Sequence, residues 1–121
     1  MNDELKQKLI DWGVDWGDVS ERFLGNENLV ITFMMKFLND KSMDLLTENI
    51  AKEDIEESFK AVHTLKGVAG NLGMKAMLPD VSNLTELLCT GKFDGAKEMY
   101  DKIKVKYDSL VAILSEYKDK V

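Results

Sequence analysis

The feature that most constrains the fold is an apolar repeat in the last quarter of the chain. Its members recur at alternating spacings of four and three residues: Ala96, Tyr100, Ile103, Tyr107, Leu110, Leu114 and Tyr117. This spacing places all of them on one side of an α-helix. Such a helix must bury its apolar side against other helices. We expect it to pack inside a helical bundle rather than to form an intermolecular coiled coil.

The remainder of the chain also favours helices. It contains one proline in 121 residues, and runs of β-branched residues are scarce. Short connections between successive long helices predict antiparallel neighbours. The sequence therefore predicts an all-α fold, an antiparallel up-down-up-down four-helix bundle with short additional N-terminal helices. The expected helices cover approximately residues 2–12, 15–24, 27–50, 53–72, 74–90 and 96–117.

Several residues are expected to define the helix ends. Asp15, Asn26 and Asp94 are predicted N-caps, because short polar side chains accept hydrogen bonds from the free N–H groups of a first turn. Gly73 is predicted to end a helix in the left-handed conformation. Pro79 must lie in the first turn of its helix, where a missing N–H is harmless.

The expected helix 27–50 has the least regular pattern. The polar segment 39–42 lies in its middle and indicates either a kink or a short interruption. Met34, Met35 and Met43 are predicted to fill the core rather than to form a binding groove. The predicted inward side is apolar and comprises Leu29, Phe33, Phe37, Leu38, Leu45, Leu46 and Ile50.

Composition limits the functional classes. The apolar share of 45% and the charged share of 31% are typical of a soluble globular domain, and the net charge is −6. Nonspecific nucleic-acid binding needs a basic face, so we expect no nucleic-acid partner. We also expect no membrane segment and no signal peptide. Cys89 is the single cysteine, consistent with the cytoplasm, and is predicted to be buried.

These features predict one domain over residues 1–121, present as a monomer. Residues 1–25 would form a helical lid and residues 26–118 the bundle. The first helix would either cover one end of the bundle or dock partners.

The only histidine, His63, falls just outside the apolar arc of its expected helix. Gly67 and Gly70 follow on the same stripe, and Lys60 and Lys66 flank the histidine at i−3 and i+3. A glycine inside a helix costs roughly 1 kcal/mol relative to alanine. Two glycines beside an exposed imidazole therefore indicate that another backbone must approach the ring.

Phosphoryl transfer is the chemistry that fits this arrangement. A neutral imidazole is nucleophilic near pH 7, because its reference pKa is about 6.5. Lysines can neutralise the added charge of a phosphoryl group. One histidine and one cysteine far apart make a zinc site improbable on spacing, so we expect no metal ligands. A phosphate-binding loop of the GxxxxGK[ST] type is absent, so we expect neither ATP binding nor autokinase activity.

The run His63-Thr64-Leu65-Lys66-Gly67, followed by Gly70-Asn71-Leu72-Gly73, resembles the histidine-containing phosphotransfer (HPt) domains of multistep phosphorelays. The resemblance implies that His63 is the phosphoacceptor, Lys66 its charge partner and Gly67 the clearance for docking, with Thr64 and Gly70 also on the receiver-docking surface. The role of Lys60 follows from the helical wheel and not from the family pattern. Family members often carry a Gln or Glu on the next helix that orients the histidine. Here either Thr85 or Glu86 lies near that place.

The resemblance implies a phosphocarrier in two-component signalling. It would take a phosphoryl group from a receiver-domain aspartate and pass it to another receiver, with response-regulator receivers, including that of a hybrid histidine kinase, as partners. No cofactor of its own is expected, and Mg²⁺ would be supplied by the partner receiver domain. The alternative is a helical interaction module that binds a receiver or kinase without carrying phosphate.

Overall fold

The computed structural model describes residues 2–120, and all regular elements within that range are helical. The predicted all-α class is therefore confirmed. The elements are α1 (Asn2–Trp12), α2 (Trp16–Arg22), α3 (Glu27–Lys36), the 3-10 helix η1 (Phe37–Asn39), α4 (Ser42–Ala51), α5 (Ile55–Asn71), α6 (Leu78–Cys89) and α7 (Ala96–Tyr117).

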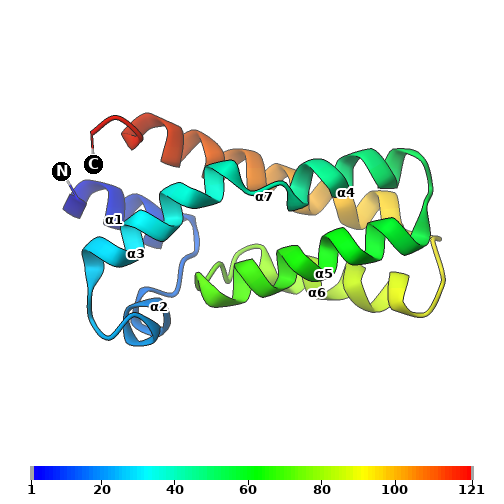
Figure 1. Cartoon of the computed structure of the whole chain (residues 1–121), viewed down its shortest axis with the longest axis horizontal. Helices are drawn as coiled ribbons and strands as arrows, with labels where there is room; N and C mark the ends of the chain where they lie inside the picture. Colours follow the sequence, from blue (N-terminus) through cyan, green and yellow to red (C-terminus); the bar gives the residue numbers. More distant parts are fainter. Residues whose placement is uncertain (1, 121) are drawn as a thin grey trace.

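Helices α4, α5, α6 and α7 form an antiparallel bundle, as predicted (Figure 1). Each of these helices packs against the next, and α7 returns alongside α4. The N-terminal helices α1, α2 and α3 lie at one end, where α1 packs against the C-terminal part of α7. Trp12 links these two helices, because its indole Nε1 donates a hydrogen bond of 3.0 Å to the carbonyl of Lys106.

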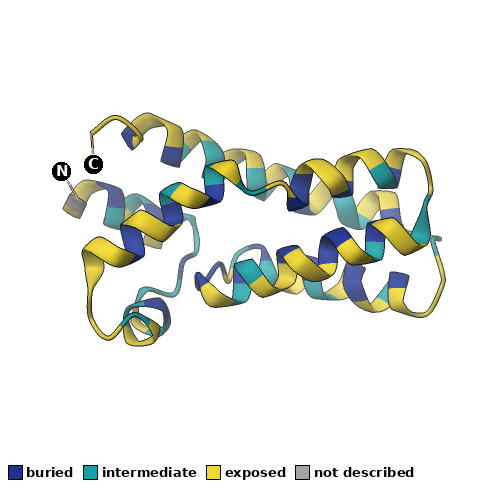
Figure 2. Ribbon diagram, in the orientation of Figure 1, coloured by how far each residue is buried: buried dark blue, intermediate teal, exposed yellow. Residues whose placement is uncertain are grey.

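The apolar repeat of α7 faces the core as the spacing predicts. Ala96, Ile103 and Leu110 are fully buried, and Figure 2 shows buried residues on the inward faces of the bundle helices. Tyr100 and Tyr107 are only half-buried, and the Tyr100 hydroxyl lies 2.6 Å from the Thr47 hydroxyl. Burying each large aliphatic side chain contributes about 1.5–3 kcal/mol, so this seam is a main source of stability.

The expected helix 27–50 is interrupted rather than kinked. Its first half ends in η1, and Asp40 is extended, with φ −70° and ψ 136°. The Asp40 carboxylate accepts a hydrogen bond of 2.8 Å from the Ser42 N–H and so replaces a helical carbonyl as the partner of that group. Because of this break, α3 and α4 are separate helices, and residues in one no longer follow the helical periodicity of the other. The prediction that a single inward face runs along residues 27–50 was therefore wrong.

Three residues predicted to face inward are instead exposed. Leu29 is 38% exposed, Phe33 39% and Leu45 49%. Met34 and Met43 are buried, which confirms them as core residues. Met35 is half-buried and packs against the core.

The predicted caps are confirmed with one exception. Asp15 accepts from the Asp18 N–H and Asn26 from the Leu29 N–H, each at 3.1 Å. Gly73 has a φ of +63°, as a left-handed stop requires. Asp94 does not cap α7, because the N-cap position is taken by Gly95 with a φ of +90° and without a side-chain hydrogen bond.

Two further expectations about α6 were wrong or imprecise. The helix begins at Leu78 rather than near Met74, and Pro79 lies in its first turn as predicted. Cys89 ends the helix and is exposed, not buried. It lies one position beyond the buried Leu88, so the helical rotation carries it to the solvent side.

Residues 73–76 are held by the connection between α1 and α2 instead of joining α6. The Asp15 N–H donates to the Gly73 carbonyl at 2.8 Å, and the Ala76 N–H donates to the Gly13 carbonyl at 3.2 Å. An isolated antiparallel bridge joins Val14 to Met74. These long-range bonds give the Gly73 carbonyl and the Ala76 N–H partners outside α6. They also tie the N-terminal helices to the C-terminal end of α5.

Replacement of Gly13 tests the contribution of this contact between the α1–α2 connection and residues 73–76 to stability. Gly13 has a φ of +127°, and an added Cβ would lie 2.4 Å from the Ala76 Cβ. We expect Gly13→Ala to lower the free energy of unfolding by about 1–3 kcal/mol, as measured by urea denaturation. Gly17→Ala is the matched control, since its added Cβ meets nothing closer than 3.6 Å. Equal stability of the two variants would show that the close packing of Gly13 against Ala76 does not contribute to stability.

The Asp15 carboxylate makes the stability of the same contact dependent on pH. Its ion pair with Lys75 at 2.7 Å and its bond from the Asp18 N–H hold the pKa of Asp15 below its ordinary value of 3.8. A depressed folded-state pKa means that stability is present above the ordinary value and is lost as the pH falls through the folded pKa.

We expect Asp15→Asn to lower the melting temperature at pH 7, and the difference from wild type to shrink between pH 5 and about pH 3. Asparagine retains the capping oxygen, so the change isolates the charge. Thermal melts across this range measure the effect, with Asp101→Asn on the exposed side of α7 as the control. A difference that does not change with pH would show that the ion pair contributes nothing.

Candidate functional site

His63 is an exposed side chain in the middle of α5. Its ring stacks on Phe59, one helical turn earlier, with centroids 5.6 Å apart and planes 16° apart. Phe59 is half-buried and packs against the core, so it provides a fixed surface for the imidazole. Within residues 2–120 no hydrogen bond or ion pair engages the ring, so both nitrogens are available.

Helix α5 holds His63 in this position through its cap and its buried face. The Asp54 carboxylate accepts a hydrogen bond of 3.0 Å from the Glu57 N–H at the first turn. The opposite side of the helix is anchored in the core by Ser58, Ala61, Val62, Leu65 and Ala69. With that face fixed, position 63 must point away from the bundle.

Gly67 and Gly70 form an open strip beside the histidine. A Cβ built at either position meets nothing within 4 Å, and neither has a positive φ. Neither packing nor backbone conformation therefore requires glycine here. This agrees with the expectation that these residues leave room for another molecule.

The two flanking lysines differ in their surroundings. Lys66 is exposed and forms no ion pair with any part of the chain that the structure describes. Lys60 Nζ lies 3.7 Å from a carboxylate oxygen of both Glu56 and Glu57. Lys66 is thus free to neutralise a new charge near the ring, whereas Lys60 must first leave two carboxylates.

Thr64 lies on the side of α5 that faces α4. Its hydroxyl donates to the Lys60 carbonyl at 3.0 Å. Thr64 and Lys60 border a groove of about 450 Å³ between the two helices, and the exposed Leu45 lies on the opposite wall. The predicted docking residues therefore extend from this groove to the glycine strip.

The structure joins neither candidate orienting residue to the imidazole. Thr85 is buried, and its hydroxyl donates to the Val81 carbonyl of the same helix at 2.7 Å. Glu86 is exposed. Phe59, which sequence reasoning missed, is the side chain in contact with the ring. Its contact with His63 could have been predicted from the sequence, because Phe59 lies four residues before His63 and residues at i and i+4 are neighbours on a helix.

The described part of the chain, residues 2–120, contains no group of three or more His, Cys, Asp or Glu side chains arranged to hold a metal ion. No helix in that part has the length and apolar content that crossing a bilayer would need.

The comparisons with known proteins agree with the geometry of α5. The model of the Hpt domain family matches residues 36–116, which is well over half of the chain and includes α4, α5, α6 and most of α7. No curated protein and no solved structure matches the chain significantly. Hpt domains act in histidine phosphotransfer in two-component phosphorelays and interact with receiver domains of response regulators. Because this match includes the helix that carries the exposed histidine and extends over most of the chain, the chain belongs to the Hpt domain family.

Proposed function

We propose that the protein is a phosphocarrier in which His63 takes a phosphoryl group from the aspartate of one receiver domain and passes it to another. The observation that carries the proposal is the exposed imidazole with both nitrogens unengaged, next to a glycine strip that the fold does not need. Family membership supports histidine phosphotransfer, and the chain's only histidine supports the assignment of the residue.

The proposed step is an in-line substitution at phosphorus. The lone pair of His63 Nε2 attacks the phosphoryl group, a P–N bond forms, and the P–O bond to the receiver aspartate breaks to restore a carboxylate. The Nδ1 proton can then leave to solvent. The reverse reaction loads the second receiver. Mg²⁺ on the receiver would neutralise the phosphoryl oxygens, and the chain itself would need no cofactor.

Phe59 would act as a positioning residue in this step. Its near-parallel contact covers one face of the imidazole and would favour ring orientations close to that plane. A restricted ring needs less reorganisation to reach the in-line geometry, and positioning contributes much of the catalysis in phosphoryl transfer. Lys66 would stabilise the phosphorylated ring by its charge, with help from Lys60 once that residue leaves its glutamates.

Mutagenesis can compare the contributions of Lys66 and Lys60 to the rate of phosphoryl transfer. We expect Lys66→Ala to slow transfer from a phosphorylated receiver by about tenfold, equivalent to a loss of about 1.4 kcal/mol in transition-state stabilisation. We expect Lys60→Ala to have a smaller effect, because Lys60 is paired with Glu56 and Glu57. Single-turnover transfer rates measure both variants. A larger loss for Lys60→Ala would contradict the ranking.

An interaction module without phosphate is the second candidate. The exposed Leu45 and Phe33 favour it only in part, because they would serve any docking protein. Incubation with a phosphorylated receiver and Mg²⁺ separates the candidates. A carrier acquires acid-labile, base-stable label, whereas a module binds the receiver and stays unlabelled. We further propose that the protein acts in the cytoplasm as a monomer and has no kinase activity of its own.

A further inference from the structure

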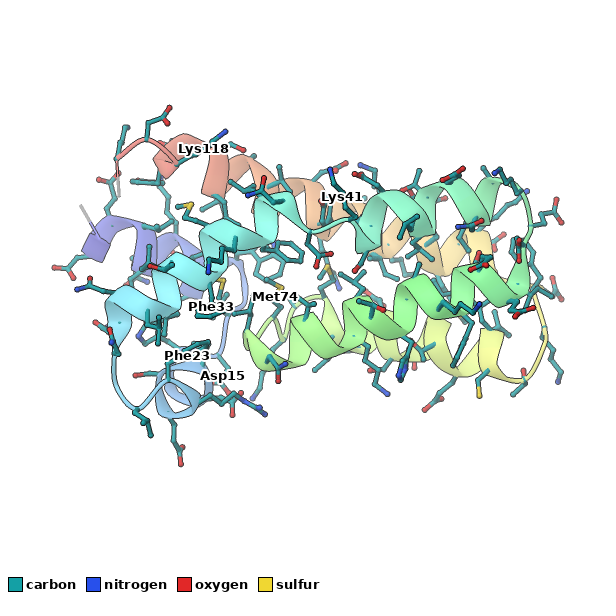
Figure 3. The ribbon with its side chains drawn as sticks, in the orientation of Figure 1. Asp15, Phe23, Phe33, Lys41, Met74 and Lys118 are labelled. Carbon is teal, nitrogen blue, oxygen red and sulfur yellow. The ribbon has the colours of Figure 1, made fainter. Side chains whose placement is uncertain are left out.

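A second candidate site lies at the C-terminal end of α5. A pocket of about 690 Å³, here called the α2–α5 pocket, opens between α2, α3, η1 and the last turn of α5. Its apolar walls comprise Phe23, Phe33, Phe37, Val68 and Leu72. The rings of Phe23, at the end of α2, and Phe33 of α3 are tilted by 38° with centroids 5.2 Å apart (Figure 3). The volume falls within the range of 300–1,000 Å³ that is typical of small-molecule sites.

The lining of this pocket includes side chains that donate hydrogen bonds. Arg22 uses its Nε to bind Asp18 at 3.1 Å, which leaves its terminal nitrogens for a ligand. Lys36 Nζ lies over the Phe33 ring, 4.9 Å from the centroid, and pairs with no carboxylate in residues 2–120. The amide of Asn71 adds a further neutral donor.

One carboxylate, Asp40, also lines the pocket, but it is already engaged. Its Oδ1 accepts the bond from the Ser42 N–H that begins α4. Arg22 and Lys36 therefore line the pocket together with one carboxylate, Asp40. Arg22 also forms an ion pair with Asp18, whereas Lys36 forms none with the residues that the structure describes. An apolar ligand without charge would leave these cations unused.

We propose that the α2–α5 pocket binds a small amphipathic anion, an aromatic or aliphatic carboxylate or sulfonate. The apolar body would occupy the space between Phe23, Phe33 and Leu72. The anionic head would meet Arg22 and Lys36, where charge-assisted hydrogen bonds are the strongest available. The site is independent of phosphoryl transfer. Because Val68 and Asn71 belong to the same helix as His63, occupancy would change the surface beside the proposed docking strip.

A neighbouring groove provides the control for specificity. It lies between α3 and α7, has a volume of about 760 Å³, and also includes Lys36 in its lining, together with Lys118. An anion bound there would depend on Lys118, whereas an anion in the α2–α5 pocket would depend on Arg22. Single variants at these two positions therefore distinguish the sites.

The test is a fluorescence titration of the full chain with the anionic probe 8-anilinonaphthalene-1-sulfonate. We expect saturable binding that weakens at least fivefold in Arg22→Gln and further in Arg22→Gln/Lys36→Gln, but changes less than twofold in Lys118→Gln. The neutral probe N-phenyl-1-naphthylamine should bind wild type and the double variant within twofold of each other, which shows that the pocket persists.

Phe33→Ala should weaken both probes, and this exposed position should tolerate the change, as circular dichroism can verify. The proposal is overturned if the anionic probe does not saturate, if Arg22→Gln leaves its affinity unchanged, or if Lys118→Gln weakens it as much as Arg22→Gln does.

Discussion

His63→Gln is expected to abolish phosphoryl acceptance from a receiver domain while leaving the helical circular dichroism and the melting temperature nearly unchanged. Glutamine has no nucleophilic ring nitrogen. The side chain it replaces is exposed and is joined to the described part of the chain only by its contact with Phe59. Exposed substitutions of this kind usually change stability by no more than about 0.5 kcal/mol. Transfer of radiolabel and a thermal melt measure the two quantities.

Lys102→Gln is the matched control for this variant, because it introduces the same residue at an exposed position of α7. It should transfer like wild type. A large loss of helix in His63→Gln would show that His63 is structural, and label retained in that variant would place the phosphoryl group on another residue.

Gly67→Gln is expected to reduce receiver-dependent transfer about 100-fold or more with His63 intact. A glutamine would fill the space that is open within 4 Å of this position. An approaching receiver would then be held away from the ring, and a displacement of about 1 Å can lower a rate by this factor. Single-turnover transfer measures the effect. Unimpaired transfer would remove the role assigned to the glycine strip.

The stability of the same variant provides the control. Because glycine is unfavourable inside a helix, Gly67→Ala should raise the free energy of unfolding by up to about 1 kcal/mol, and Gly67→Gln should not lower it. A small phosphodonor such as phosphoramidate needs no docking surface. It should therefore label His63 in Gly67→Gln about as fast as in wild type, which separates blocked docking from damaged chemistry.

The helices with a regular buried face could be predicted from the sequence. In α7 the repeat from Ala96 to Tyr117 specifies one helix, because every turn contributes to the same apolar side. In α5 the same logic predicts His63, Gly67 and Gly70 on the side away from the core, where His63 and Gly67 are exposed and Gly70 is half-buried. These are local relations along one helix, and local geometry determines them.

The features that depended on distant residues could not be predicted. The α1–α2 connection pairs with Gly73 and Ala76, and these bonds shorten α6 at its N-terminus. The polar segment 39–42 predicted either a kink or a short interruption. The structure has an interruption, in which Asp40 is extended and its carboxylate accepts a hydrogen bond from the Ser42 N–H. Leu45 and Phe33 were assigned to the core on the assumption of one helical phase, which that break removes.

The same division applies to the sites. Helical spacing predicts Lys60 and Lys66 three residues before and after His63, but it does not show that the attraction of Lys60 to Glu56 and Glu57 competes with any interaction at the ring. The α2–α5 pocket joins residues from four elements, and no sequence motif brings Arg22 and Asn71 together. Such a site is visible only once the tertiary structure is known.

The most direct test of the central claim is an NMR measurement on the imidazole of the chain's single histidine. Isotope-labelled protein is mixed with a phosphorylated receiver domain and Mg²⁺, and the ring ¹⁵N resonances are followed together with ³¹P. We expect the His63 resonances to shift because phosphorus becomes bonded to Nε2. Addition of a second, unphosphorylated receiver should reverse the shift. Unchanged His63 resonances while the receiver loses its phosphoryl group to water would contradict the central claim.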